Sequence, residues 1–294
     1  MTQLTWDQQG ERTYETGVDH GVLYQIDEAG EYVDGVAWNG LTTVTESPTG
    51  AEASPQYADN LMYLNLISVE RFGCTIEAFT YPPEFEQNDG SAVPTVGVTI
   101  GQQSRKPFGF CYRTLKGNDT QGNDHGYKLH LVYGATAAPS EKAYATVNDS
   151  PEAITFSWEV TTIPVAVGTI GGHDYKPTAS ITIDSTKVDS AKLATLLEQL
   201  YGTESSDPSM PLPEDVITMM TATLTVATPT QPTFNSGTHT ITIPTVTGVV
   251  YTIDGEVVAA GPVVITEDTI VKAYPATGYK FPTPIDDDWL YDFV

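Results

Sequence analysis

The sequence predicts a mainly β protein, with a first domain that is a sandwich or barrel and a smaller β domain after it. Val, Ile, Thr and Tyr are abundant whereas Leu is sparse, which is a composition typical of strands. Alternating β-branched or aromatic residues recur over residues 1–185, separated by Gly, Asn, Asp and Pro turns. With 294 residues the chain is long enough for two cores.

Four runs carry the alternating pattern most clearly in the first domain. They are residues 21–26 (GVLYQI), 95–100 (TVGVTI), 127–133 (YKLHLVY) and 153–160 (AITFSWEV). Successive side chains of a strand point to opposite faces, so each run predicts a strand with one buried face. Residues 38–60 begin like a strand and become polar and rich in Pro and Gly, which predicts a long loop that has a function or is disordered.

One helix is expected, over residues 191–201. Asp189 or Ser190 can cap its N-terminus, and Gly202 can end it. One face of this helix carries Leu193, Leu196, Leu197 and Leu200. This stripe indicates packing against a sheet.

The chain is expected to divide into residues 1–226 and residues 227–294. Residues 217–226 are interpreted as a last strand of the first domain, and a Thr- and Pro-rich linker follows. Short alternating runs then occur at residues 238–243, 249–253, 263–265 and 269–274, with a hairpin signal at Asp254-Gly255. They predict a small immunoglobulin-like sandwich.

The charge is strongly acidic, with 38 Asp and Glu against 13 Lys and Arg and a net charge of −25. Such a chain repels the phosphates of nucleic acids, which argues against a nucleic-acid-binding protein. Five basic residues nevertheless fall within a tenth of the chain, namely Arg105, Lys106, Arg113, Lys116 and Lys128. They indicate either a solvated hairpin or an interface that meets an acidic edge of another copy.

The N-terminus has no basic segment followed by an apolar one, and no run approaches the roughly 18 apolar residues that span a bilayer. We therefore expect a soluble product made in the cytoplasm, without membrane insertion. Cys74 and Cys111 are expected to be buried free thiols, because a reducing cytoplasm disfavours a disulfide.

No set of residues for catalysis is found. The five histidines are His20, His125, His130, His173 and His239. His20 and His125 each follow an aspartate, but adjacent residues of a strand point to opposite faces. A metal site formed by the middle three lacks any supporting spacing. We therefore expect no catalytic residues, no cofactor and no metal, and a protein that is not an enzyme.

Six stretches of the first domain, taken together, resemble the major tail proteins of long-tailed bacteriophages. In order they are residues 35–42 (GVAWNGLT), 57–63 (YADNLMY), 77–85 (EAFTYPPEF), 106–113 (KPFGFCYR), 127–133 (YKLHLVY) and 158–160 (WEV). The resemblance covers about two thirds of the chain and depends on the order of these stretches rather than on any one of them.

The resemblance implies a tail-tube β-sandwich or barrel with one flanking helix. Six copies would join their sheets into a ring, and stacked rings would form a tube with an acidic lumen through which DNA passes without specific binding. It also implies contacts with tape-measure, tail-initiator and tail-terminator proteins, assembly in the host cytoplasm and a final place in the virion. The long loop after Trp38 would reach neighbouring subunits.

Candidate residues follow from the charge pattern and from the matching stretches. For the subunit interface they are Arg105, Lys106, Arg113, Lys116, Lys128, Trp38 and Tyr57. For the lumen they are Glu46, Glu70 and Glu77, which only strand alternation selects.

An alternative is a secreted or surface β-rich adhesin that binds carbohydrate. It has the same composition, but a secretory signal would be expected at its N-terminus. Tyr279, Phe281 and Trp289 could either bind cell-wall carbohydrate or fill the core of the small sandwich.

Overall fold

A computed structural model describes residues 4–147, 149, 153–170, 173–221, 224–276, 278–282 and 284–293. Strands hold 49% of the chain and helices 9%, which confirms the mainly β prediction. Contacts divide the chain into two compact units, Met1–Val188 with Leu196–Thr218, and Asp189–Thr195 with Met219–Val294. No helix among the described residues is both long and apolar enough to cross a membrane.

The described residues of the first unit form fourteen strands and a 3-10 helix. These are β1 (Thr13–Ile26), β2 (Tyr32–Trp38), β3 (Leu41–Glu46), β4 (Ala53–Ala58), β5 (Leu61–Ile67), β6 (Gly73–Ala78), η1 (Pro83–Gln87), β7 (Ala92–Thr95), β8 (Val98–Ile100), β9 (Phe108–Asn118), β10 (Gly122–Ala137), β11 (Phe156–Thr162), β12 (Thr169–Ile170), β13 (His173–Asp174) and β14 (Ser180–Asp184). Helices α1 (Ser190–Tyr201) and α2 (Pro213–Thr221) each contain residues of both units.

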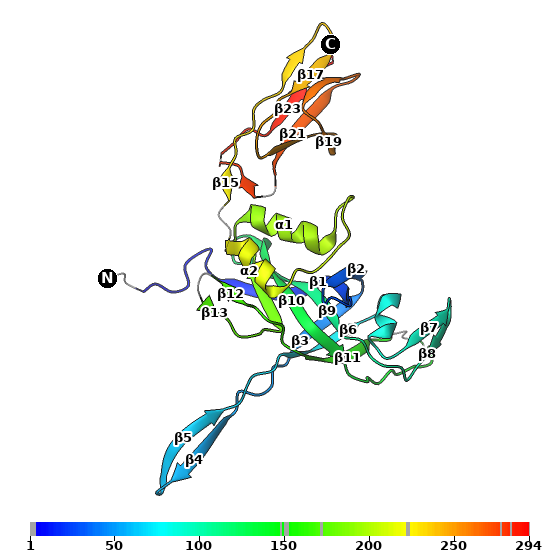
Figure 1. Ribbon diagram of the computed structural model, residues 1–294, viewed down its shortest axis with the longest axis vertical. Helices are drawn as coiled ribbons and strands as arrows, with labels where there is room; N and C mark the ends of the chain where they lie inside the picture. Colours follow the sequence, from blue (N-terminus) through cyan, green and yellow to red (C-terminus); the bar gives the residue numbers. More distant parts are fainter. Residues whose placement is uncertain are drawn as a thin grey trace. The chain divides into compact units, whose positions relative to one another are not determined.

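An eight-stranded antiparallel sheet forms the centre of the first unit (Figure 1). Its strand order is β2-β1-β9-β10-β11-β6-β3, and β14 pairs with β10. The long strands β9 and β10 run through both of its halves. In one half the sheet continues from β10 to β11, β6 and β3. In the other half, as far as the described residues show, it contains only β1, β9, β10 and β14.

An aromatic core fills the first half. Trp38, Phe85 and Trp158 lie within 5.5 Å of one another, measured between ring centroids, and all three are buried. The indole nitrogen of Trp38 donates to the carbonyl of Thr80 at 3.0 Å. Buried aromatic rings contribute most of the packing energy of such a core, so loss of one ring costs about 3–5 kcal/mol.

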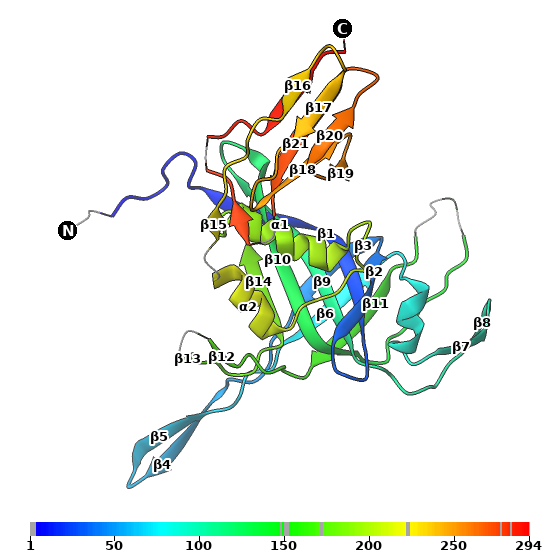
Figure 2. The same ribbon diagram turned by 45° about the horizontal axis from the view of Figure 1, so that its top comes forward.

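The opposite face of the sheet packs against the segment Leu196–Thr218 of the same unit, which holds the end of α1 and the start of α2 (Figure 2). The Tyr133 hydroxyl of β10 donates to the carbonyl of Pro211 in this segment at 3.0 Å. The Tyr24 hydroxyl donates to the carbonyl of Leu200 at 2.6 Å, and Leu200 is buried. The expected helix is confirmed in position: Asp189 accepts the N–H of Ala191 at 3.0 Å, and Gly202 follows with a φ of 76°.

Three local predictions were wrong. Residues 217–226 do not form one strand, because helix α2 begins at Pro213 and continues to Thr221. Residues 95–100 do not form one strand, because they contain the end of β7, a turn at Gly97 with a φ of 81°, and β8. The long loop expected over residues 38–60 instead contains β3 and β4, and it ends at Asp59 and Asn60, which have positive φ and form the turn of the hairpin of β4 and β5.

The second unit is a small sandwich of two sheets over one core. Its strands are β15 (Thr225–Val226), β16 (Thr233–Asn235), β17 (Thr240–Ile243), β18 (Val249–Ile253), β19 (Glu256–Val258), β20 (Gly261–Val264), β21 (Thr269–Pro275), β22 (Tyr279–Lys280) and β23 (Asp288–Tyr291). The sheets are β16-β17-β20 and β19-β18-β21-β23, and β15 pairs with β22. Trp289 is buried in the core and Phe281 packs against it, so these two rings fill the core rather than form an exposed binding surface.

Cys74 and Cys111 are free and buried, as expected. Burial raises the pKa of the Cys74 thiol to about 12 and raises that of Cys111 further. A thiol-specific reagent at pH 8 should therefore leave the folded protein unmodified and label both residues after unfolding in urea. Rapid labelling of either thiol in the native protein would contradict this placement.

Candidate functional site

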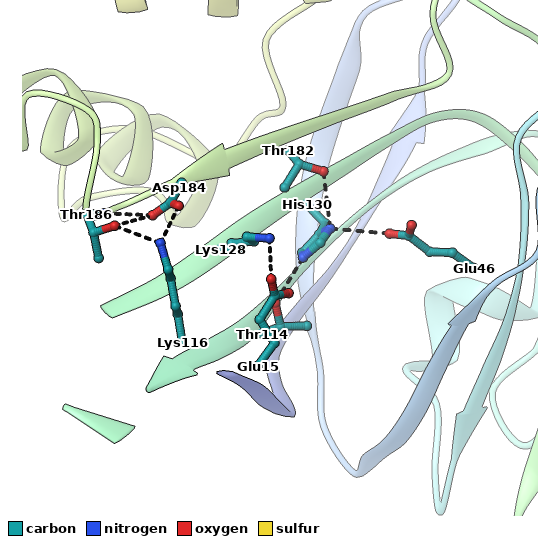
Figure 3. A network of polar contacts seen from close by, with 9 residues as sticks. All are labelled: Glu15, Glu46, Thr114, Lys116, Lys128, His130, Thr182, Asp184 and Thr186. Carbon is teal, nitrogen blue, oxygen red and sulfur yellow. Dashed lines mark hydrogen bonds and ion pairs between the residues drawn. The ribbon is translucent and has the colours of Figure 1, made fainter. Parts of the chain in front are cut away.

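A network of charged and polar side chains covers one face of the sheet where it contains only β1, β9, β10 and β14 (Figure 3). Alternation along β9 and β10 explains its position. Phe108, Phe110 and Tyr112 of β9 lie in the core, and the next side chains on the same face are those of Thr114 and Lys116. The network therefore continues the face of the core beyond its end.

His130 of β10 lies at the centre of this network. Its ring stacks on that of Tyr112 with centroids 4.6 Å apart, and its Nε2 lies 3.0 Å from the Thr114 hydroxyl. Its Nδ1 lies 3.3 Å from Oε1 of Glu46, which also accepts a hydrogen bond from the Tyr112 hydroxyl at 2.7 Å. Thr182 of β14 approaches the same Nδ1 at 3.4 Å. His130 thus connects β3, β9, β10 and β14.

Burial lowers the pKa of His130 below its ordinary value of 6.5, and Lys128 lowers it further, whereas Glu46 and Glu15 oppose the shift. Burial and the bond to Glu46 raise the pKa of the Tyr112 hydroxyl. At neutral pH the ring of His130 is therefore uncharged.

Two ion pairs flank His130. Lys116 contacts Asp184 at 2.6 Å, and Lys128 contacts Glu15. Burial alone would raise the pKa of Asp184, but the bonds from Lys116 and Thr186 outweigh it and lower the pKa to about 2. Both lysines are therefore neutralised within the same subunit.

The order hydroxyl, imidazole and carboxylate in Thr114, His130 and Glu46 is that of a nucleophilic triad. Such a triad also requires free N–H donors for an oxyanion. Strand β9 is paired with β1 on one side and with β10 on the other at this level, so its amides are in the ladder. We interpret the contacts as cross-strand links that hold four strands in register.

The half of the sheet formed by β1, β9, β10 and β14 has two open edges. Strand β2 pairs only with Gly21–Ile26 of β1, and among the described residues no strand pairs with the outer side of Thr13–Asp19. Strand β14 likewise pairs only with β10 within that part of the chain. Irregular register around Gly17 and His20, which have φ values of 65° and 50°, bends β1 where its open half begins.

The outward-facing backbone of β14 is centred on Thr182. The backbone N–H of Tyr133 donates to the carbonyl of Ala179, and the N–H of Ser185 donates to that of Tyr127. The backbone N–H and C=O groups of the odd-numbered residues of β14 therefore point toward β10. By alternation the N–H and C=O of Thr182 point to the open edge. This edge is available for pairing with another strand.

A second exposed element is the hairpin of β4 and β5, which extends away from the sheet (Figure 1). Every residue of both strands is exposed. The large apolar side chains among them are Tyr57, Leu61, Met62, Tyr63, Leu64, Leu66 and Ile67. So much apolar surface on one hairpin indicates a contact surface.

The interface candidates lie in different places. Arg113 pairs with Asp19 at 2.8 and 2.9 Å on the helix side of the sheet, where it lowers the pKa of that carboxyl. Trp38 is in the core, where its side chain is not open to a partner, whereas Tyr57 is 71% exposed on the hairpin. Lys106 is exposed, and its backbone bonds to that of Gln87.

Lys116 and Lys128 belong to the polar network, and Arg105 pairs with Asp89 at 3.1 Å. Of the lumen candidates only Glu46 joins the network. Glu77 points away from the core face of β6, and Glu70 is exposed at the base of the hairpin.

Sequence reasoning missed the acidic partners Glu15 and Asp184. They lie 113 and 68 residues from the lysines that they contact, and no local pattern links them. The open edges were missed because strand neighbours depend on the topology. The turn Asp59-Asn60 was a local signal for the hairpin, since these residues tolerate positive φ.

Comparison with models of known protein families finds no match, and neither does comparison with curated protein sequences.

The neutral state of His130 predicts a pH dependence of stability. The folded protein binds a proton at His130 less readily than the unfolded chain, so the free energy of unfolding should fall as the pH drops below about 6.5. In His130→Gln this decrease should be smaller, by up to about 1.4 kcal/mol per pH unit. Urea unfolding at pH 7.5, 6 and 5 measures it. The exposed His173→Gln is the control, and parallel slopes for wild type and His130→Gln would refute the assignment.

Proposed function

We propose that the chain is a structural subunit that assembles with itself into stacked rings, as the major tail-tube protein of a long-tailed bacteriophage. The observation that carries the proposal is the pair of open edges, β1 and β14, on opposite sides of one four-stranded part of the sheet. Edges left open in this way favour strand addition.

Strand directions make the two edges compatible. Strands β1, β9, β10 and β14 are successively antiparallel, so β1 of a second copy placed beside β14 continues the alternation. Each copy would use its β1 edge to contact one neighbour and its β14 edge to contact the other. Such a head-to-tail contact closes into a ring when the rotation between copies divides a full turn.

In the proposed ring the sheets form one barrel, with the helices on the outside and the polar network on the inside. The inner face would then carry Glu15, Glu46 and Asp184, while Lys116 and Lys128 are already paired. With His130 uncharged, this face offers no unpaired cation among these residues to hold a phosphate. DNA would pass through such a lumen without being retained.

The sequence resemblance supplies the number of six copies and the partner proteins of the tail. The exposed hairpin of β4 and β5 is the proposed contact between rings. The second unit, a two-sheet sandwich, is proposed to be the immunoglobulin-like domain, outside the ring contacts.

Blocking one edge tests the ring. Thr182→Pro removes the outward N–H and keeps the ladder to β10, because proline is tolerated where the N–H faces solvent. We expect folded subunits whose unfolding free energy changes by about 1 kcal/mol or less, and no rings in negative-stain micrographs. Thr182→Val loses the same hydroxyl but keeps the N–H and should form rings. Rings from the proline variant would exclude this edge, and a wild type that stays monomeric and binds glycans would favour the adhesin alternative.

Shortening the hairpin tests the stacking. The bridge between Thr49 and Arg71, with N···O distances of 2.9 and 2.7 Å, closes its base, so residues 52–68 can be replaced by a short Gly/Ser turn. Because the replaced side chains are exposed, circular dichroism and the unfolding free energy should be unchanged within about 1 kcal/mol. Electron microscopy should show single rings but not tubes. Tubes of normal length would show that the hairpin does not join the rings.

A further inference from the structure

A groove of about 380 Å³ lies beside η1 and the hairpin of β7 and β8, away from the polar network. Arg105, Lys142 and Asp89 line it, together with the polar residues Ser91, Gln102 and Ser140. Gly90 lets the groove form, because a Cβ at this position would lie 3.2 Å from the Arg105 side chain, and its φ of 77° disfavours other residues.

The groove holds two cations and one carboxylate. Arg105 Nη1 lies 3.1 Å from Oδ1 of Asp89, and Lys142 Nζ lies 2.6 Å from Oδ2 of the same side chain. Asp89 is only 7% exposed, whereas Arg105 and Lys142 are 24% and 28% exposed. The carboxylate therefore lies beneath the cations, which face the groove.

The ratio of two cations to one carboxylate in the groove differs from the one-to-one ratio of the other Lys and Arg pairs described in the first unit. Arg113, Lys116 and Lys128 each contact a carboxylate of their own. Arg105 and Lys142 share one, which leaves one surplus positive charge in a chain with a net charge of −25.

Hydrogen-bond donors remain on both cations. Arg105 uses Nη1 for Asp89 and for the carbonyl of Ala137, and within the described residues its other N–H groups make no hydrogen bond. Lys142 makes one hydrogen bond to a described residue, Asp89, and lies over the ring of Tyr81 at 5.2 Å. A planar acceptor with two oxygens suits these remaining donors.

We propose that this groove binds a carboxylate side chain of a second copy of the chain. The inference rests on the proposed self-assembly and adds to it a specific contact. The chain itself supplies the ligand, with 38 acidic residues. The adjoining hairpin exposes apolar side chains, Val96 at 98% and Val93 at 50%, which a protein surface can cover and a nucleic-acid backbone cannot.

Zero-length cross-linking with a carbodiimide tests the contact, because this reagent joins a lysine amine to a carboxylate only when the two touch. An equal mixture of ¹⁴N- and ¹⁵N-labelled protein is allowed to assemble, cross-linked, digested and analysed by mass spectrometry. We expect cross-links from Lys142 to a carboxylate peptide of the other isotope, which only contact between copies can produce.

Two variants give opposite shifts. Lys142→Gln removes the surplus charge and leaves the pair of Arg105 and Asp89, so the protein concentration needed for assembly should rise about tenfold. Asp89→Asn leaves both cations unpaired and should lower that concentration, provided that circular dichroism shows the native fold. Lys176→Gln, an exposed lysine changed by the same charge, is the control and should assemble like the wild type.

Each contrary result has a distinct meaning. Cross-links of Lys142 only to its own Asp89, in copies that cross-link elsewhere, would overturn this inference and leave the proposed function standing. An absence of any cross-link between copies would remove both. Protection of Lys142 by a short DNA duplex, without a carboxylate cross-link, would also overturn it in favour of a phosphate ligand. If Lys142→Gln and Lys176→Gln assembled at the same protein concentration, both the prediction for the variants and the inference would be overturned.

Discussion

The register between β9 and β10 is the constraint on which the first unit depends. These two strands carry aromatic residues such as Phe110 into the core at one end and Lys116 and Lys128 onto the polar face at the other. A slip of one residue would exchange the faces and place charged side chains beneath the helices. Asn118 holds the turn, since its Oδ1 accepts the N–H groups of Thr120 and Gln121 at 3.2 and 2.6 Å.

Local patterns predicted parts of β1, β10 and β11 and helix α1, because alternation, a capping Asp189 and a terminal Gly202 act within a few residues of one another. Helix α2 was missed although Pro213, Glu214 and Asp215 are good residues for a first helical turn, and the apolar run after them was interpreted as a strand. The polar network could not be predicted, because Glu15 and Asp184 meet their lysines only through the strand order. Periodicity identifies which face a residue occupies and leaves its neighbour on the next strand undetermined.

The net charge of the chain also does not show which charged side chains form ion pairs within the fold. In the first unit Arg113, Lys116 and Lys128 are each paired with a carboxylate on another strand, so these cations serve to position strands. Removing Arg113 or Lys116 would leave a partly buried carboxylate, Asp19 or Asp184, without its partner on a molecule that is already strongly acidic, which costs more than the loss of an exposed pair. The acidic composition therefore makes Arg113 and Lys116 less replaceable than their exposure suggests.

The irregular register of β1 has a geometric consequence. Gly17 and His20, both with positive φ, bend the strand between the half that pairs with β2 and the half with the open edge. In the proposed ring that bend contributes to the angle at which one subunit meets the next, and the angle determines the circumference of the ring. A straighter β1 would give a wider circle or an open ribbon, so the bore of the tube would be encoded in two backbone conformations rather than in any side chain that touches its contents.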